Sequence, residues 1–280
     1  MAVDLHVHST ASDGRYTPGQ LVRMACENHV TALALTDHDT VDGVFEAASA
    51  GRKYQVRVIP GVELSTDIED AEIHILGYYV DVSSAKFRRA LHALREGRAR
   101  RAQKILEKLD KLGIKIPLSY VFSLGKDGFV GRSQVFRAMV NLGYARPERR
   151  YGDFEKYLGK QGAAYVEHYG FTPREAVAAV LSAGGVPVLA HPGRTAGDSI
   201  VTDLIEAGLA GIEAYYPTHS PEIVKRWVAV ARRHNLIVTG GSDFHGVAPD
   251  EPARLGGVAV PEEVVSELDK RWRQLAHEKR

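Results

Sequence analysis

Strand and helix signals alternate at both ends of this 280-residue chain, and that alternation restricts the folds it can adopt. A threonine followed by a proline, the usual opening of a helix, occurs at residues 17–18 and 172–173. Repeated strand–helix units predict an α/β fold with a largely parallel sheet, either open or closed into a barrel. The expected strands are residues 2–9, 31–36, 56–62, 72–80, 186–190, 211–216 and 236–239, and further helices are expected at 44–53, 201–207, 221–234 and 262–277.

The alternation is interrupted between residues 83 and 162, where helical and turn-rich sequence replaces it. Residues 83–115 hold eleven Lys or Arg against three acids, so this segment carries +8 and the rest of the chain −7. We interpret 83–162 as a mainly helical insertion (cap) domain, and 1–82 with 163–280 as the barrel. The basic residues of this helix either form an ordinary solvated surface or create an electrostatic field that attracts phosphorylated nucleotides and RNA ends. Its expected apolar face consists of Phe87, Leu91, Leu94, Ile105, Leu109 and Leu112.

Composition excludes several classes of protein. Hydrophobic residues make up 44% and charged residues 25%, which is ordinary for a globular chain and excludes a disordered or collagen-like one. A single cysteine, Cys26, excludes an intramolecular disulfide. We expect it on a helix, with its side chain in the hydrophobic core of the protein. There is no basic leader and no apolar run of about 18 residues, so we expect a cytoplasmic protein without a membrane span.

Histidines and acids collect where the expected strands end. His6 and His8 lie two residues apart on the first strand, so both side chains point to one face. Asp243 and His245 have the same spacing after the last strand. In (β/α) barrels, catalytic groups lie at the carboxyl ends of strands and on the following loops, so these side chains are expected to converge. Four more residues of the same kind lie at or after other expected strands: His38, Glu63, His74 and His191.

Each fragment by itself has an ordinary structural explanation. A His-x-His or Asp-x-His pair on a strand is more often structural than functional, and Glu63 alone could pair with an arginine. Together, so many imidazoles and carboxylates at one barrel mouth would be costly to desolvate without a cation. Nitrogen and oxygen donors without thiolate suit Mn²⁺, Fe²⁺ or Zn²⁺. The pattern therefore predicts a site for divalent metals, with three ions fitting the ligand count if Glu63 bridges.

Six motifs, in a fixed order over nearly the whole chain, resemble the PHP (polymerase and histidinol phosphatase) superfamily. They are DLHVHS at 4–9, SDG at 12–14, TDHDT at 36–40, PGVELS at 60–65, AHPG at 190–193 and GGSDFHG at 240–246. The resemblance implies a distorted (β/α)7 TIM-like barrel that holds two or three divalent ions. Manganese is expected first, with iron and zinc as alternatives.

The same resemblance implies which residues hold the metals and act in catalysis through them. The first metal would be held by His6, His8, Glu63 and Asp243. The second would be held by Asp13, His38 and His245. The third would be held by Glu63, His74 and His191.

The SDG motif is similar to that of one branch, the 3′,5′-nucleotide phosphatases and a related 5′→3′ exoribonuclease that trims short RNA. Arg132 follows a glycine, as in that branch's Gly-Arg-x-His motif, and would grip a phosphate bidentately. Gln134 and Tyr216 stand where that branch usually has histidine. An arginine beside a metal cluster can instead serve only to neutralise the charge of nearby carboxylates. A histidine on a loop can simply be exposed to solvent. The expected substrate-binding residues are Arg132, Gln134, Arg194 and His219.

The leading hypothesis is a metal-dependent phosphoesterase that removes the 3′-phosphate of nucleoside 3′,5′-bisphosphates by attack of a metal-bridging hydroxide. The enzymatic alternative is a 5′→3′ exoribonuclease acting on short RNA at the same site. The SDG motif and the insertion argue against a histidinol phosphatase, and the intact ligand positions argue against a metal-free PHP scaffold. The expected partners are therefore phosphorylated nucleotides or short RNA, with no membrane and no obligate protein partner.

Overall fold

The computed structural model describes residues 2–68, 71–124, 130–146, 150–167, 171–194, 198–246 and 253–278. The chain forms two compact units. The first comprises Met1–Leu91 and Phe171–Arg280, and the second comprises His92–Gly170. Each unit has a buried hydrophobic core of its own.

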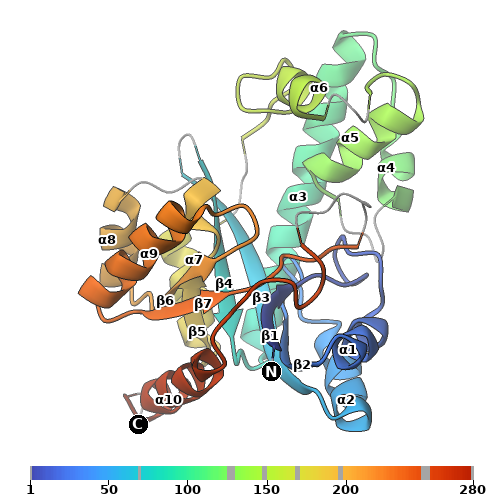
Figure 1. The fold of residues 1–280 in the computed structure, drawn as a ribbon. Coiled ribbons are helices and arrows are strands. Elements are labelled where there is room, and N and C mark those ends of the chain that lie inside the picture. The colour runs from blue at the N-terminus through green and yellow to red at the C-terminus, as the bar shows by residue number, and fades with distance from the viewer. Residues whose placement is uncertain are drawn as a thin grey trace. The chain divides into compact units, whose positions relative to one another are not determined.

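In the described part of the first unit, a seven-stranded sheet follows the order of the chain (Figure 1). All neighbouring strands are parallel except β4, which runs antiparallel to both β3 and β5. The chain beyond β7 returns to β1: Val7 pairs with Phe244, whose carbonyl accepts from the amide of His8 at 3.0 Å. The sheet is thus closed, and the predicted α/β barrel is confirmed. Its strands are β1 (Ala2–Val7), β2 (Val30–Leu35), β3 (Arg57–Ile68), β4 (Ala71–Tyr78), β5 (Val186–Leu189), β6 (Gly211–Tyr215) and β7 (Ile237–Gly240).

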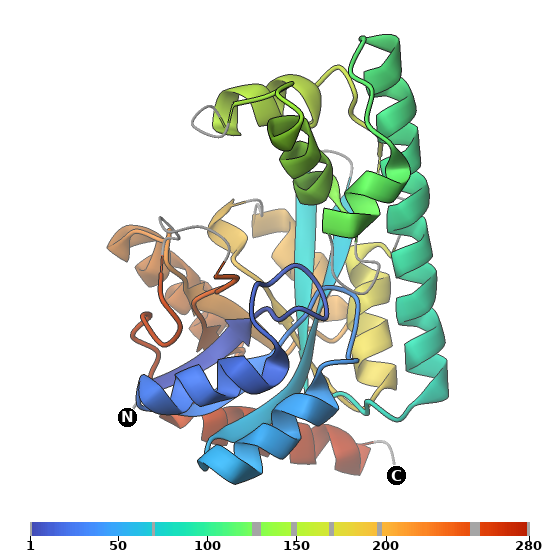
Figure 2. The same cartoon turned by 90° about the vertical axis from the view of Figure 1, so that its right-hand side faces the viewer.

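Helices follow the strands and pack on their outer faces. Thr17 caps α1 by accepting from the amide of Gln20, while the Gln20 side chain accepts from the amide of Thr17. Figure 2 shows α1 and α2, in blue, running side by side. Cys26 on α1 is exposed, so its expected place in the core is wrong. These helices are α1 (Pro18–Glu27), α2 (Val44–Tyr54), α7 (Pro173–Ser182), α8 (Asp198–Glu206) and α9 (Pro221–Arg233).

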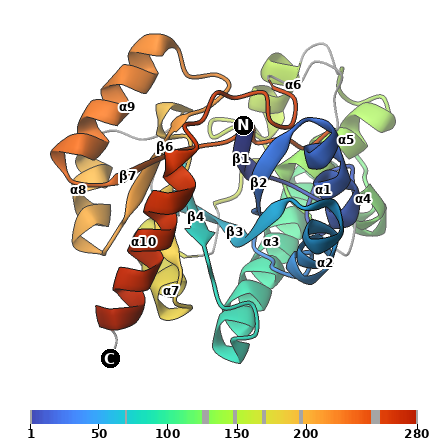
Figure 3. The same cartoon turned by 60° about the horizontal axis from the view of Figure 1, so that its bottom comes forward.

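The last helix, α10 (Glu263–Glu278), crosses one end of the barrel (Figure 3). Its buried side chains, Leu268 among them, belong to the same core cluster as Val3, Leu5 and Val188 from the strands. Helix α10 and these apolar side chains fill one end of the barrel. The polar residues of the interior therefore lie at the opposite end. None of the helices in the described ranges is long and apolar enough to cross a bilayer.

The second unit is helical. Helix α3 (Ala85–Lys111) starts in the first unit and continues through the second, where Ile105 and Leu109 enter the core. Leu112 was expected on this apolar face but is 49% exposed, because α3 ends one residue earlier and Gly113 turns the chain with a φ of +81°. The remaining helices of this unit are α4 (Leu118–Leu124), α5 (Arg132–Asn141) and α6 (Arg150–Tyr157).

Strand β3 is longer than its apolar run predicts. The expected strand ends at Val62, yet pairing with β4 continues through Glu63, Ser65 and Asp67 to Ile68. The segment from Glu63 to Ile68 was not predicted as strand, because only Leu64 and Ile68 in it are apolar. The resulting β3–β4 pair confirms the predicted pairing of the strand at 72–80 with its predecessor.

Substitution of Gly241 by alanine should destabilise the barrel. A Cβ at this position would overlap the Cβ and the amide nitrogen of His6. Overpacking of this kind costs about 1–3 kcal/mol, which urea-induced unfolding of the metal-free protein will measure. Gly152→Ala is the matched control, because Gly152 lies on α6 with nothing within 4 Å. That variant should gain about 0.5–1 kcal/mol, and equal stability of Gly241→Ala and the wild type would contradict the packing argument.

Candidate metal centre

The side chains predicted to bind metal converge at the barrel end opposite α10. His6 lies on β1, and His8 follows it directly. Glu63 and His74 lie on β3 and β4, and His191 lies two residues after the end of β5. The structure brings all nine predicted ligands together, the other four being Asp13, His38, Asp243 and His245.

The carboxylate of Glu63 lies at the middle of this cluster and is only 1% exposed. Its Oε1 lies 2.7 Å from Nδ1 of His74 and 3.0 Å from Nε2 of His191. Its Oε2 faces three further ring nitrogens, those of His6 at 3.2 Å, His8 at 3.2 Å and His38 at 3.1 Å. A single buried carboxylate thus contacts imidazoles from both sides of the barrel, the arrangement expected of a bridging ligand.

Among the described residues, three groups have donor atoms within 4.8 Å of one another. The group of His6, His8, Glu63 and Asp243 has the composition expected for the first metal. The second group contains Asp13, His38 and His245 as expected, with His8 in addition. The third contains Glu63 and His74 with His38, while His191 approaches the same Glu63 oxygen as His74.

The donor set fits a divalent cation. Nε2 of His6, Nε2 of His8 and Oε2 of Glu63 are buried and lack a hydrogen-bond partner among the described residues. Buried polar atoms are almost always hydrogen-bonded. Three potential ligand atoms that face one another without such a partner therefore indicate a site for a cation. Imidazole and carboxylate ligands without thiolate suit manganese, iron or zinc.

The charges of the site compensate one another. Burial by itself raises the pKa of the Glu63 carboxyl, but the imidazoles of His38 and His6 outweigh it and hold that pKa well below its usual range. Burial lowers the pKa of His245, but the Asp13 carboxylate 3.3 Å away reverses this and raises the pKa to about 10. His245 therefore carries a proton at neutral pH that a bound metal ion would have to displace.

Comparison with known proteins agrees with this geometry. Residues 4–97 match the model of the PHP domain family. The chain is 33% identical over 279 residues to the 3′,5′-nucleoside bisphosphate phosphatase of Chromobacterium violaceum, covering 98% of this chain and 96% of that protein. The chain belongs to the PHP family. The family resemblance predicted from the six motifs is thereby confirmed.

Two further proteins support the PHP assignment. The chain is 36% identical over 253 residues to the 5′-3′ exoribonuclease Rnm of Escherichia coli, covering 88% of this chain and 86% of that protein. A solved structure from Bifidobacterium adolescentis, assigned as a metal-dependent phosphoesterase, superimposes with a TM-score of 0.85 at 31% identity. That superposition covers 96% of this chain and 95% of the other.

Buried carboxylates behind the PHP centre hold the loops that carry its ligands. Asp37 accepts hydrogen bonds from the amide and hydroxyl of Ser9 at 2.7 and 2.6 Å and from the hydroxyl of Ser12 at 2.6 Å. Asp4 accepts from the amide and hydroxyl of Ser242 at 2.9 and 2.6 Å. These contacts fix the loop before Asp13 and the residue before Asp243. Sequence reasoning missed both carboxylates, although each lies inside one of the quoted motifs.

Two residues of the segment around β6 were also missed or only partly recognised. Glu213 is fully buried in the strand, and its Oε1 lies 3.0 Å from Nδ1 of His6. A charged residue inside an otherwise apolar strand was the signal that could have identified it. Tyr216 donates its hydroxyl hydrogen to Oδ2 of Asp243 at 2.7 Å, and its ring centroid lies 5.2 Å from that of His191. The residue that replaces histidine in this chain is therefore tied to a predicted metal ligand.

The predicted substrate residues Arg132 and Gln134 belong to the second unit. Nη1 of Arg132 donates to the carbonyl of Leu158 at 3.3 Å, and the guanidinium lies 5.7 Å from the ring centroid of Phe154. Oε1 of Gln134 accepts from the amide of Gly131 at 2.9 Å and so closes the first turn of α5. Their contacts with substrate stay predictions.

The other two substrate candidates follow strands of the barrel. His219 is buried beside Tyr216, with ring centroids 5.1 Å apart. Its Nε2 accepts from the amide of Gly193 at 3.2 Å, so its Nδ1 carries the hydrogen and donates to the carbonyl of Ala214 at 2.9 Å. Arg194 ends the short helix η3 (Pro192–Arg194), and its side chain lies outside the described residues. Both substrate roles stay predictions.

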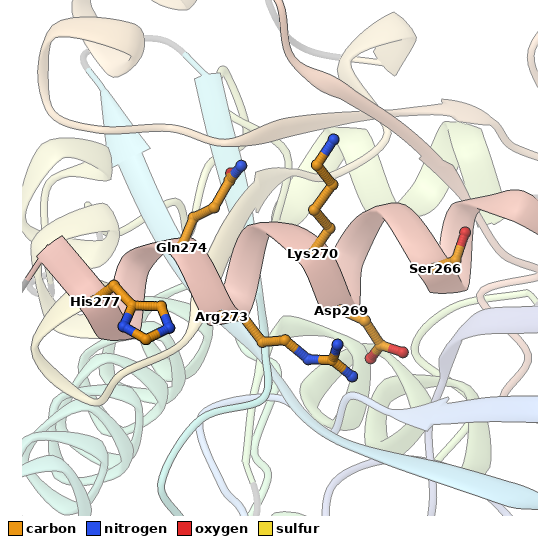
Figure 4. A pocket seen from close by; sticks show the side chains of 6 residues that line it. All are labelled: Ser266, Asp269, Lys270, Arg273, Gln274 and His277. Atoms are coloured by element: carbon orange, nitrogen blue, oxygen red, sulfur yellow. The ribbon is translucent and has the colours of Figure 1, made fainter.

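A separate surface hollow, with a volume of about 400 Å³, lies along α10 (Figure 4). All of its lining side chains come from this one helix, and Asp269 among them is already bonded to Arg57 at 2.5 Å and to the Tyr79 hydroxyl at 2.6 Å. Within the described ranges, the groups close enough to hold an ion lie at the barrel mouth instead. The histidine cluster, rather than this hollow, is therefore the candidate metal centre.

The affinity of the centre for metal should rise with pH. Because Asp13 raises the pKa of His245 to about 10, this imidazole is protonated below that pH, and metal binding must release its proton. We expect an increase of about tenfold in affinity per pH unit for each proton released. Calorimetric titration of Mn²⁺ into the stripped protein, in buffers of different ionisation enthalpy, will count those protons.

A control variant for this measurement is His92→Ala, which removes a 65% exposed histidine of α3. It should leave the pH dependence of metal affinity unchanged. An affinity that is independent of pH, with no proton released, would contradict the assignment of His245 as a ligand.

Proposed function

We propose that this PHP protein is a metal-dependent phosphoesterase that removes the 3′-phosphate of nucleoside 3′,5′-bisphosphates, leaving the 5′-nucleotide and phosphate. The observation that carries the proposal is Glu63, buried among five imidazoles at the barrel mouth. The similarity to a 3′,5′-nucleoside bisphosphate phosphatase extends over nearly the full length of both chains and supports this substrate class.

The chemistry requires cations, and we propose manganese as the resident ion. Divalent ions in this site would neutralise the substrate phosphate and stabilise the leaving oxygen. Asp13 and Asp243 add two carboxylates on one side of Glu63, so the site offers charge for more than one ion. The proposed ligands are His6, His8, Glu63 and Asp243 for one ion, Asp13, His38 and His245 for a second, and Glu63, His74 and His191 for a third.

The residues of the chain supply orientation around these ligands. Because Tyr216 occupies Oδ2 of Asp243, the other oxygen, Oδ1, is directed at Nε2 of His8, 3.0 Å away. Asp37 and Asp4 hold the neighbouring loops through backbone amides and serine hydroxyls. A phosphoester bond could thus be cleaved by water without a serine or cysteine nucleophile, and the single cysteine, Cys26, lies on α1 and in none of the ligand groups.

A substrate with two phosphates needs cationic donors for the phosphate that is not cleaved. We propose Arg132 for this role, because it opens α5 in the Gly-Arg sequence and a guanidinium can bind phosphate with two parallel hydrogen bonds. Arg194, Gln134 and His219 are proposed as further substrate contacts. The helical unit would then act as the cap that selects the substrate, and the cytoplasm is the proposed location.

Arg132→Ala should impair use of a nucleoside 3′,5′-bisphosphate far more than use of a simple aryl phosphate. Loss of a charge-assisted contact costs about 1.5–3 kcal/mol, or about ten- to a hundredfold in kcat/KM. Steady-state kinetics on both substrates will measure the ratio. Arg137→Ala is the matched control, because Arg137 is an exposed arginine on the same helix. An equal loss on both substrates would refute the second-phosphate role of Arg132.

The substrate class itself is tested by comparing kcat/KM for adenosine 3′,5′-bisphosphate, a short 5′-phosphorylated RNA and histidinol phosphate in the presence of Mn²⁺. We expect the bisphosphate to be preferred, with release of the 3′-phosphate. Preference for histidinol phosphate would overturn the proposal. His6→Ala should abolish every one of these activities, because Nε2 of His6 faces Glu63 and Asp243 in the cluster.

The 5′→3′ exoribonuclease is the second candidate function. It is favoured by the similarity to Rnm and by the excess of Lys and Arg over acids on α3. The same metal ligands would serve on a phosphodiester. In the comparison of substrates, a higher kcat/KM on the short RNA than on the bisphosphate would establish this activity as the main one.

A further inference from the structure

Glu213 is a carboxylate with 0% exposure in the middle of β6, and it contacts two predicted metal ligands at once. Its Oε1 and Oε2 lie 3.0 and 3.2 Å from Nδ1 of His6. Its Oε2 also accepts from the backbone amide of His191 at 2.8 Å. One side chain therefore joins ligands that come from β1 and from the segment after β5.

The contact with His6 determines which ring nitrogen is available for a metal. The Glu213 oxygens act as acceptors, as the hydrogen bond from the His191 amide shows for Oε2, so Nδ1 of His6 carries the hydrogen of its contact with Glu213. The lone pair is then left on Nε2, which lies 3.2 Å from Oε2 of Glu63 and 3.3 Å from Oδ1 of Asp243. Hydrogen bonding of the second nitrogen to a carboxylate fixes the tautomer and ring orientation of metal-binding histidines.

The contact with His191 acts on the backbone. His191 has a φ of +27°, which non-glycine residues rarely adopt and which the surrounding structure must enforce. Its amide is held by Glu213, while Nε2 of its ring lies 3.0 Å from Oε1 of Glu63. The same carboxylate thus holds a strained backbone at the place from which the His191 ring reaches the cluster.

We propose that Glu213 is a positioning residue of the metal centre, which keeps His6 in the tautomer that binds metal through Nε2 and holds His191 in its strained conformation. The proposal rests on the metal-binding function proposed above. Glu213 touches neither substrate nor metal in this role. Its effect is on metal affinity, through His6 and His191.

The test is Glu213→Gln, which keeps the volume of the side chain but replaces one oxygen by an amide donor. If the remaining oxygen accepts from His191, the amide group faces Nδ1 of His6 and favours the tautomer with the hydrogen on Nε2. Mn²⁺ affinity, measured by calorimetry and by metal analysis after dialysis, should fall about ten- to a hundredfold at the site that includes His6.

Thr239→Val is the matched control. Thr239 is fully buried on β7 and is the register partner of Glu213, so the substitution perturbs the same layer of the barrel. It should leave Mn²⁺ affinity as in the wild type. A fall of equal size in both variants would mean that Glu213 acts only through packing, and would overturn the proposal.

The wild-type protein supplies a test that does not depend on folding of the variant. Nitrogen-15 shifts of the His6 ring in the protein loaded with diamagnetic Zn²⁺ will report its tautomer, and we expect hydrogen on Nδ1. Hydrogen on Nε2, or unchanged Mn²⁺ affinity in Glu213→Gln, would overturn the positioning role while leaving the phosphoesterase function intact. A wild-type protein that binds no Mn²⁺ would instead refute the metal centre itself.

Discussion

The burial of Glu63 among imidazoles is the interaction on which the rest of this structure depends. A carboxylate with 1% exposure loses its hydration and must recover that free energy from its neighbours. Here the neighbours arrive from β1, from β4 and from the segments after β2 and β5. The reversed direction of β4 is part of this arrangement, because it places His74, near the start of that strand, at the end where the parallel strands finish. The direction of this one strand therefore brings its histidine into the site.

Three residues with a strained backbone lie at the same place. His191, Asp39 and Asp243 have φ values of +27°, +52° and +52°, and such conformations cost about 1–3 kcal/mol each. The amide of Asp39 donates to the carbonyl of Glu63 at 3.0 Å, and the amide of Asp243 donates to the carbonyl of His6 at 2.9 Å. Each strained amide is therefore bound either to a predicted ligand residue or, for His191, to Glu213. Burial of the apolar core that α10 shares with the strands offsets the free energy of this strain.

The α/β alternation was predictable because apolar runs and helix caps are local signals, and the barrel and its family followed from the resemblance of six motifs to the PHP superfamily. The sequence also predicted which side chains would meet, since strands of one direction end at one edge of a barrel. The polar half of β3 was not predicted, because residues such as Ser65 and Asp67 become strand only through pairing with β4. The contacts of Glu213 and Asp37 were not predicted either. A buried carboxylate is recognisable as unusual, but its partners come from distant segments, and their identity depends on the closed sheet.

At two positions the chain has another residue where the resemblance predicts histidine, and both residues make defined contacts. Gln134 closes the first turn of α5 through the amide of Gly131, and Tyr216 binds Oδ2 of Asp243. The side chain of Gln134 is engaged by a backbone amide, whereas an imidazole at the same position could be protonated and place a positive charge near a phosphate. Tyr216 donates its hydroxyl hydrogen to a predicted metal ligand, which changes the surroundings of the cluster while all nine predicted ligands remain. The metal chemistry can therefore stay constant while residues around it are exchanged. This separation is physically reasonable because Glu63 contacts five imidazoles at once, so its replacement would disturb the whole cluster, whereas exchange of Tyr216 leaves those contacts in place.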